Sequence, residues 1–182
     1  MNPELVALIV VTLFLASMAV YAALRGRDAA GDERGLPRAL RGAPIAYAER
    51  TFRSHRQKLV ARLDRAYRTD RGLELVELKT RAGNVVYMSD VIELSVQRIA
   101  VQDETGQAVA SEAWVVVQSS LTGARRPHRV QLLDDDEVAA MSERYRAIVG
   151  NRVGELRPAK SMRQCQQCSH RGRCSAYFGD RL

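Results

Sequence analysis

The stretch LVARLDRAYRTDRGLELVELKTR, residues 59–81, decides the predicted fold. Apolar residues alternate with more polar ones from Leu59 to Leu63, and such alternation is typical of a strand with one buried face. A Thr-Asp-Arg-Gly turn at 69–72 follows, and a second alternating run extends from it to Thr80. The stretch therefore predicts a hairpin or two adjacent strands.

Charged residues at three positions of this stretch indicate a site for chemistry. Asp64 lies on the first predicted strand, while Glu77 and Lys79 lie two apart on the second and so project to the same side. An adjacent strand can bring Asp64 within reach of Glu77. Two carboxylates can hold a hard divalent cation such as Mg2+, and a neighbouring ammonium can orient or help deprotonate a water. We expect phosphodiester hydrolysis, although an exposed strand with cross-strand ion pairs carries the same pattern.

Other segments extend this hairpin into an α/β domain. Ile45, Ala48, Phe52 and His55 recur at helical spacing, so a first helix is expected over 45–57 with that face packed inward. After the hairpin, we expect a short strand at 84–88 and a helix from Ser89 or Asp90 to about Gln102, with Glu93 and Gln97 on one face. Two strands are then expected at 113–118 and 128–133, separated by a basic loop at 122–127. A last helix is expected to start at the acids 134–136 and to end near Gly150.

Composition limits the class of protein and the partner. The 182 residues are 46% hydrophobic and 27% charged, which fits one globular domain and excludes a collagen, a disordered tail or a large multidomain enzyme. The net charge is +7, and residues 1–24 hold one acid, Glu4, and no Lys or Arg. The excess positive charge predicts a polyanionic partner, either nucleic acid or an anionic membrane surface. The absence of a glycine-rich phosphate loop and of G-x-S-x-G gives no support to nucleotide-driven motors or serine hydrolases.

An apolar segment at residues 5–24 predicts a membrane anchor. Its 20 uncharged positions span roughly 30 Å as a helix, the thickness of the hydrocarbon core. Arg25 and Arg27 follow the segment and no basic residue precedes it, which favours an uncleaved single-pass anchor with its C-terminal end in the cytoplasm. Residues 25–43 then form a juxtamembrane linker, and the domain extends over 44–182.

Three cysteines near the C-terminus form the pattern C-x2-C-x5-C. Cys165, Cys168 and Cys174 are an odd number of closely spaced thiols, which suits a soft-metal site better than a disulfide framework. Free thiolates need a reducing compartment, in agreement with a cytoplasmic domain. A metal site is therefore expected in this tail, with a vestigial site as the alternative.

Taken together, these motifs resemble the PD-(D/E)xK nuclease superfamily, in the RecB-like branch that includes CRISPR-associated iron–sulfur exonucleases. The resemblance runs from about Ile45 to Cys174. It implies an α/β restriction-endonuclease-like core, which is a mixed central sheet flanked by helices. It also implies that Asp64, Glu77 and the carbonyl of Leu78 face Mg2+ or Mn2+.

The resemblance assigns roles to further residues. Gln97 would orient groups at the site, and His55 would lie near the metal unless it is a packing residue. The three cysteines would be the last ligands of an iron–sulfur cluster, but no Cys precedes Cys165, so Zn2+ with three thiolates and a His is an alternative. The tyrosine that the family places after the Gln is replaced by Val101.

The predicted function is that of a membrane-anchored, metal-dependent deoxyribonuclease. Lys79 would position or activate the attacking water and stabilise developing charge. Arg81, on the same side as Lys79, either meets a phosphate or is a solvated strand-end charge. One rival is a catalytically inactive nucleic-acid-binding module tethered at the membrane, and another is a structural membrane protein whose arginines contact anionic lipid.

Overall fold

The structure, a computed structural model, describes residues 35–150, 152, 162–166, 168–169 and 171–174. The predicted membrane segment at 5–24 lies outside the described residues, as does most of the predicted linker at 25–43. Within the described ranges, no helix is both long enough and apolar enough to cross a membrane. The chain divides into two compact units, Met1–Val138 and Ala139–Leu182, and the first contains the sheet.

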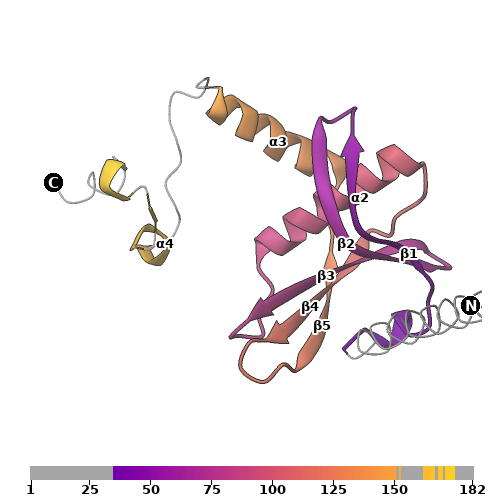
Figure 1. The fold of residues 1–182 in the computed structure, drawn as a ribbon. Coiled ribbons are helices and arrows are strands. Elements are labelled where there is room, and N and C mark those ends of the chain that lie inside the picture. Colours follow the sequence, from indigo (N-terminus) through magenta and orange to yellow (C-terminus); the bar gives the residue numbers. More distant parts are fainter. Residues whose placement is uncertain (1–34, 151, 153–161, 167, 170, 175–182) are drawn as a thin grey trace, which may run out of the picture. The chain divides into compact units, whose positions relative to one another are not determined.

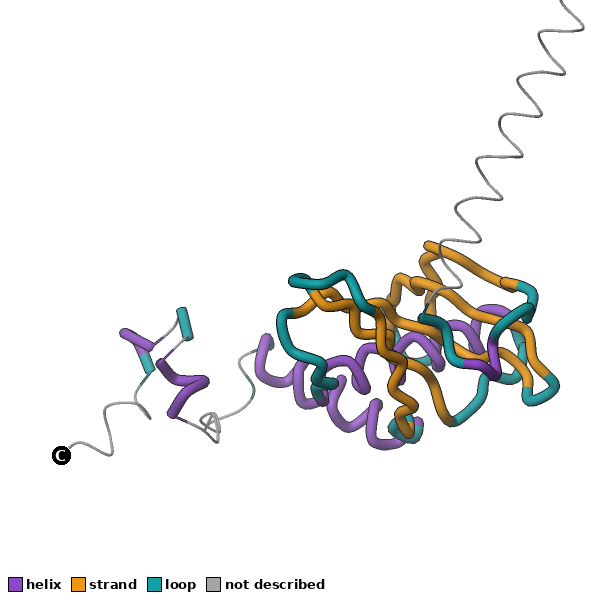
Figure 2. The backbone as a smooth tube through the Cα atoms, turned by 90° about the horizontal axis from the view of Figure 1, so that it is seen from below, coloured by secondary structure: helices purple, strands orange, loops and turns teal. Residues whose placement is uncertain are grey.

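Five strands form one mixed sheet in the order β1-β2-β3-β4-β5. The strands are β1 Ile45–Ser54, β2 Leu59–Thr69, β3 Gly72–Arg81, β4 Glu112–Ser119 and β5 Arg125–Gln131. The helices are η1 Arg38–Leu40, α2 Met88–Thr105, α3 Asp135–Val149, α4 Met162–Gln166 and η2 Arg171–Arg173. β3 and β4 are parallel, and the other neighbouring strands of this sheet are antiparallel. Helix α2 connects β3 to β4 and lies against one face of the sheet (Figures 1 and 2), which fits the expected restriction-endonuclease-like core.

The predicted hairpin is confirmed as β2 and β3. Thr69 pairs with Gly72 at the turn, where the Thr69 hydroxyl donates to the Gly72 carbonyl at 3.1 Å and accepts the Arg71 N–H at 3.2 Å. Gly72 has φ +99°, and a Cβ there would lie 2.6 Å from the Ala108 carbonyl oxygen. Only glycine combines this left-handed backbone with so close an approach, so the turn residue fixes the register of the hairpin.

The helix predicted over 45–57 is wrong, because these residues form strand β1. Phe52 and Ser54 are buried while Thr51 and Arg53 are exposed, which is the period of two that a strand produces. β1 pairs with β2 along most of its length, so tertiary pairing satisfies its backbone groups in place of a helix. The expected inward face also fails at its first member, since Ile45 is 50% exposed.

The strand predicted at 84–88 is also absent, because the described residues 84–87 form a loop that leads directly into α2. The helix begins at Met88, and its third residue, Asp90, accepts the Tyr87 N–H at 2.9 Å. Asp90 therefore occupies the inner position of a capping arrangement and is not the cap itself. α2 extends past the predicted end to Thr105, where Gly106 in the left-handed conformation ends it.

Both faces of the central strands are buried. Leu73 and Leu75 of β3 pack with Val115 and Val117 of β4 under α2. On the opposite face, a second apolar cluster is formed by Leu36, Leu40, Tyr67, Val76 and Val116, with Trp114 and Ala43 packed against it. Burial on both sides explains the continuous apolar run AWVVVQ in β4, because no position of that strand faces water freely.

The strands predicted at 113–118 and 128–133 correspond to β4 and β5. β5 starts earlier than predicted, so Arg125 and Arg126 of the expected basic loop are strand residues. The predicted start of the last helix is confirmed: Asp134 Oδ1 accepts the Glu137 N–H at 2.8 Å, and Glu137 Oε2 accepts the Asp134 N–H at 2.9 Å. This reciprocal pair of hydrogen bonds is a capping box, which agrees with the prediction that the acids at 134–136 start a helix.

Candidate active site

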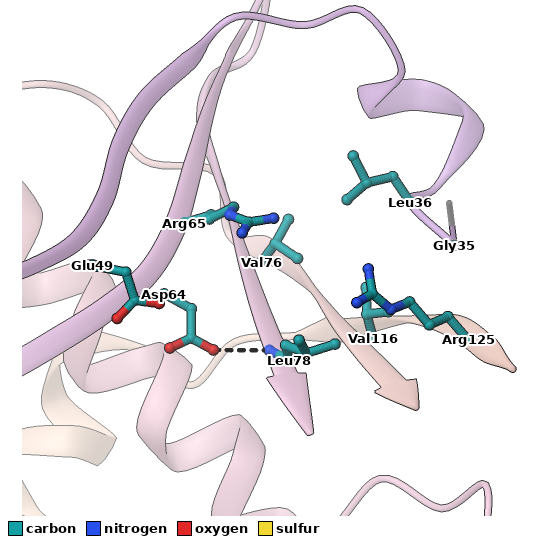
Figure 3. A pocket seen from close by; sticks show the side chains of 9 residues that line it. All are labelled: Gly35, Leu36, Glu49, Asp64, Arg65, Val76, Leu78, Val116 and Arg125. Carbon is teal, nitrogen blue, oxygen red and sulfur yellow. Dashed lines mark hydrogen bonds between the residues drawn. The ribbon is translucent and has the colours of Figure 1, made fainter. Parts of the chain in front are cut away.

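The candidate site lies where β2 and β3 separate. Their pairing runs from Thr69↔Gly72 to Arg65↔Val76 and stops there, so Asp64 and Glu77 are the first opposed positions beyond the ladder. At this point Asp64 Oδ2 accepts the Leu78 N–H at 3.0 Å (Figure 3). A side-chain carboxylate thus takes the place of a strand partner and is fixed in the gap between the strands.

Glu77 is the buried carboxylate of the site and is 3% exposed. Its Oε1 accepts a hydrogen bond from Lys79 Nζ at 2.7 Å, and its Oε2 accepts one from Gln97 Nε2 at 2.9 Å. Burial raises the pKa of Glu77, the hydrogen bonds from Lys79 and Gln97 oppose that rise, and the nearby carboxylates of Asp64 and Glu93 add to it. The protein therefore holds a carboxylate in a place where its negative charge is costly.

Gln97 connects the two separating strands to α2. Its amide nitrogen donates to Glu77 Oε2 on β3 and, at 3.0 Å, to the backbone carbonyl of Arg62 on β2. The amide oxygen of Gln97 is buried without a hydrogen-bond partner among the described residues. A single helix residue thus fixes the Glu77 carboxylate and the edge of the gap, which is the position predicted for it.

Lys79 lies between two carboxylates. Its Nζ donates to Glu77 Oε1 and to Glu93 Oε2, each at 2.7 Å. Burial alone would lower the pKa of Lys79, but the hydrogen bonds to Glu77 and Glu93 outweigh burial and raise it. The ammonium is therefore held charged and in a fixed position beside Glu77.

Two acidic residues at the site were not among the predicted site residues. Glu93 was expected only to share a helix face with Gln97, and its contact with Lys79 follows from the packing of α2 on β3. Glu49 lies on β1 with φ +50°, and Figure 3 shows its carboxylate beside that of Asp64. It is paired with Arg62 at 2.9 Å. The predicted helix over 45–57 concealed Glu49, because it placed this residue away from any strand.

A hollow on the face of the sheet away from α2 gives access to Asp64. Its lining includes the two carboxylates of Glu49 and Asp64 at one flank and apolar side chains such as Val76, Leu78 and Val116 beyond them (Figure 3). Asp64 is partly exposed, whereas Glu77 is buried. One carboxylate of the pair is therefore open to solvent and the other is oriented by the protein.

The donor set fits a hard divalent cation. Magnesium is usually held by only one or two carboxylates, with waters and substrate phosphate completing its shell, so a protein cage of three or more ligands is not required. The described residues contain no group of three or more His, Cys, Asp or Glu arranged to hold a metal. The negative charges of Asp64 and Glu93 raise the pKa of Glu77, and a cation bound at Asp64 and Glu77 would offset this repulsion.

His55 and Arg81 do not lie where the sequence predicted them. His55 is exposed in the turn at 55–58, and the strand from Leu59 to Asp64 separates it from the carboxylates by roughly 17 Å. Arg81 is neither solvated nor free for a phosphate: its side chain is 19% exposed, and its guanidinium donates to Asp90 Oδ2 and the Val85 carbonyl, both at 2.7 Å. It fastens the end of β3 to α2.

The predicted metal site at the cysteines is not present among the described residues. Cys165, Cys168 and Cys174 are free thiols, and no metal-binding group includes them there. His170, a possible fourth ligand by sequence, lies outside the described residues. The iron–sulfur cluster and the zinc site are therefore not supported.

Comparison with known protein families agrees with the chemistry of this site. The sequence model of the PD-(D/E)XK nuclease superfamily matches residues 15–175. The chain belongs to this superfamily. Its members are metal-dependent nucleases, and the order strand, strand, helix that carries Asp64, Glu77, Lys79 and Gln97 agrees with that membership.

No curated protein matches the chain. The crystal structure of SSO0001 is similar, with 13% sequence identity and a TM-score of 0.47, over 90% of this chain and 72% of that one.

Proposed function

We propose that this chain hydrolyses DNA phosphodiester bonds with Mg2+ or Mn2+ held by Asp64, Glu77 and the Leu78 carbonyl. The observation that supports the proposal most is the Glu77 carboxylate, buried between Lys79 and Gln97 and next to Asp64 in the gap between β2 and β3. A buried carboxylate with so many neighbouring acids is costly for stability alone, so a role with a cation accounts for it.

Each side chain would have a distinct task. When bound, the cation would supply Lewis-acid activation of the phosphate and of a water. Gln97 keeps the Glu77 carboxylate in one orientation through its bonds to both strands. Lys79, charged and held by Glu77 and Glu93, would hold the attacking water and stabilise negative charge that develops on the phosphate.

DNA as the substrate and the membrane as the location are parts of the same proposal. The net charge of +7 favours a polyanion, and the sequence pattern favours the RecB-like branch of the superfamily. We also propose that residues 5–24 anchor the chain as a single-pass segment with the domain in the cytoplasm, because Arg25 and Arg27 follow the apolar run.

Cleavage by the full-length chain tests the proposal. We expect single- or double-stranded DNA to be cut only with Mg2+ or Mn2+, and cleavage to fall by at least about 100-fold in Asp64→Asn, Glu77→Gln and Lys79→Met. Asp70→Asn is the matched control, because this carboxylate is exposed in the turn of the same hairpin. DNA binding without cleavage by the wild-type chain, with both metals and both kinds of substrate, would favour the inactive binding module.

A further inference from the structure

A second hollow lies at the carboxyl ends of β3 and β4, beside the candidate active site. It is formed by the loop after β3, the end of β4 and the start of β5, with Asn84, Ser119, Thr122 and Arg126 as its polar residues. β3 and β4 are parallel, and their arrows point the same way in Figure 1. In open α/β sheets, the crevice outside the carboxyl ends of parallel strands is the usual place for a ligand.

The polar groups of this hollow are hydrogen-bond donors. The Ser119 hydroxyl accepts the N–H groups of Leu121 at 3.3 Å and Thr122 at 3.2 Å, and the Thr122 hydroxyl accepts the N–H of Ala124 at 3.3 Å. Each hydroxyl oxygen is thus used as an acceptor by the backbone, so its hydrogen remains to be donated. Asn84 Oδ1 is likewise occupied by His128 Nε2 at 2.7 Å, which leaves the Asn84 amide nitrogen as a donor.

The charge of the hollow is positive. No carboxylate lines it, and its charged residue is Arg126, whose exposed guanidinium has no ion pair or hydrogen bond among the described residues. Donors around an unpaired guanidinium favour an anion over a cation or an apolar group. The remaining lining is small, with Gly83 and Ala124 among its residues, so a ligand can approach the backbone closely.

The hollow has a definite position relative to Lys79. Lys79 pairs with Val117 of β4, and Val117 pairs with Arg126 of β5, so Arg126 and Lys79 lie on the same face two strands apart. Two strand spacings amount to about 10 Å, so the Lys79 and Arg126 side chains are close enough to contact nearby phosphates of one strand. A nucleic-acid strand with one phosphate beside Lys79 can therefore present a nearby phosphate here.

We propose that this hollow is a phosphate subsite for the nucleic-acid strand, in which Arg126 contacts a phosphate near the scissile one. This inference rests on the proposed function for its substrate. Ser119, Thr122 and Asn84 add neutral hydrogen bonds to the same phosphate. The subsite positions the strand and reads no base.

The salt dependence of DNA binding by the full-length chain in EDTA tests the subsite without cleavage. Fluorescence anisotropy with a labelled single strand and a labelled duplex gives the slope of log K against log salt. Arg126→Ala should make the slope shallower by about 0.7–0.9, the amount expected for one phosphate contact, and weaken binding severalfold. Arg126→Lys should keep the slope, because it keeps the charge. Arg41→Ala, an exposed arginine outside both hollows, should leave slope and affinity unchanged.

The outcomes separate this inference from the proposed function. An Arg126→Ala slope equal to that of the wild-type chain, or an equal loss in Arg41→Ala, would overturn the subsite. Wild-type cleavage with an unchanged Arg126→Ala slope would leave hydrolysis standing and remove the subsite. The expected slope change in a chain that cuts with neither metal would support the subsite and refute hydrolysis.

Discussion

The ammonium of Lys79 lies between the carboxylates of Glu77 and Glu93 and donates a hydrogen bond to each. Burial raises the pKa of Glu77, so the ionised carboxylate is less favourable in the folded chain than in the unfolded one. Its contribution to stability is therefore greatest below the unfolded pKa and is lost as pH rises through the raised folded pKa. At neutral pH the site lowers stability, as expected where residues are arranged for chemistry.

Glu93→Gln should move the pH profile of cleavage. Loss of this carboxylate removes one of the hydrogen bonds that raise the pKa of Lys79 and one of the charges that raise the pKa of Glu77. Both pKa values should fall, so both limbs of the kcat profile should shift to lower pH. Glu143→Gln, an exposed acid on α3, is the control. A uniform loss of rate with unmoved limbs would show that Glu93 is only structural.

Glu77 and Lys79 could be placed together from sequence because strand alternation fixes which side chains share a face. Asp64 was placed near Glu77 because the predicted hairpin puts their strands side by side, and the role of Gln97 came from the resemblance to the superfamily. Glu49 could not be placed, since its place beside Asp64 depends on the irregular pairing between Ile45 and Tyr47 on β1 and on a left-handed residue. The exposed position of His55 was missed because residues 45–57 were predicted as a helix, whereas His55 lies in the turn after β1. The phosphate role of Arg81 was wrong because a partner nine residues away, Asp90, takes up its guanidinium.

At the scale of elements, the join between β3 and α2 is held by the Arg81–Asp90 pair. Asp90 is 2% exposed and also accepts the Tyr87 N–H, while Arg81 lies 4.6 Å from the centre of the Tyr87 ring. Although burial opposes ionisation, the hydrogen bonds from Arg81 and Tyr87 hold the pKa of Asp90 below its usual value. This stabilisation is present above the unfolded pKa and is lost as pH falls through the lower folded pKa.

Asp90→Asn should therefore lower the free energy of unfolding by about 3–5 kcal/mol at pH 7, because it leaves Arg81 with an unpaired charge in a mostly buried place. The loss should shrink at pH 3, below the ordinary aspartate pKa of about 3.9, because the stabilisation from the ionised wild-type carboxylate is lost as pH falls through its lower folded pKa. Urea unfolding of both proteins at the two pH values measures it. Asp70→Asn should change stability by less than about 0.5 kcal/mol. Equal midpoints for Asp90→Asn and wild type would refute this role.

The misassigned helix over 45–57 shows a limit of periodicity. Ile45, Ala48 and Phe52 are spaced as in a helix, but β1 pairs with a strand that begins beyond the next turn, and that long-range pairing decides the conformation. The hairpin at 59–81 was predictable because its turn and its alternation are local. Local signals were also sufficient for the start of α3, where Asp134 and Glu137 are three residues apart.

At the scale of the whole molecule, a nuclease domain follows a proposed membrane anchor. If residues 5–24 span the membrane with Arg25 and Arg27 inside, protease added to intact cells should leave the domain uncut, and cell lysis should expose it. An epitope tag after Leu182 provides the readout on immunoblots. Digestion of the tag in intact cells would contradict the orientation, and recovery of the chain in the supernatant after high-salt washing of membranes would contradict the anchor.

Asp64 and Glu77 are proposed to hold one divalent cation together, and a Mn2+ titration followed by electron paramagnetic resonance measures that binding. The full-length wild-type chain should remove one equivalent of Mn2+ from the free-ion signal at pH 7.5, and Mg2+ should compete. Asp64→Asn and Glu77→Gln should each weaken binding by at least about tenfold, because each removes one of the two carboxylate ligands. Asp70→Asn should bind as the wild type does. Unchanged Mn2+ affinity in both site variants would show that Asp64 and Glu77 do not hold the cation.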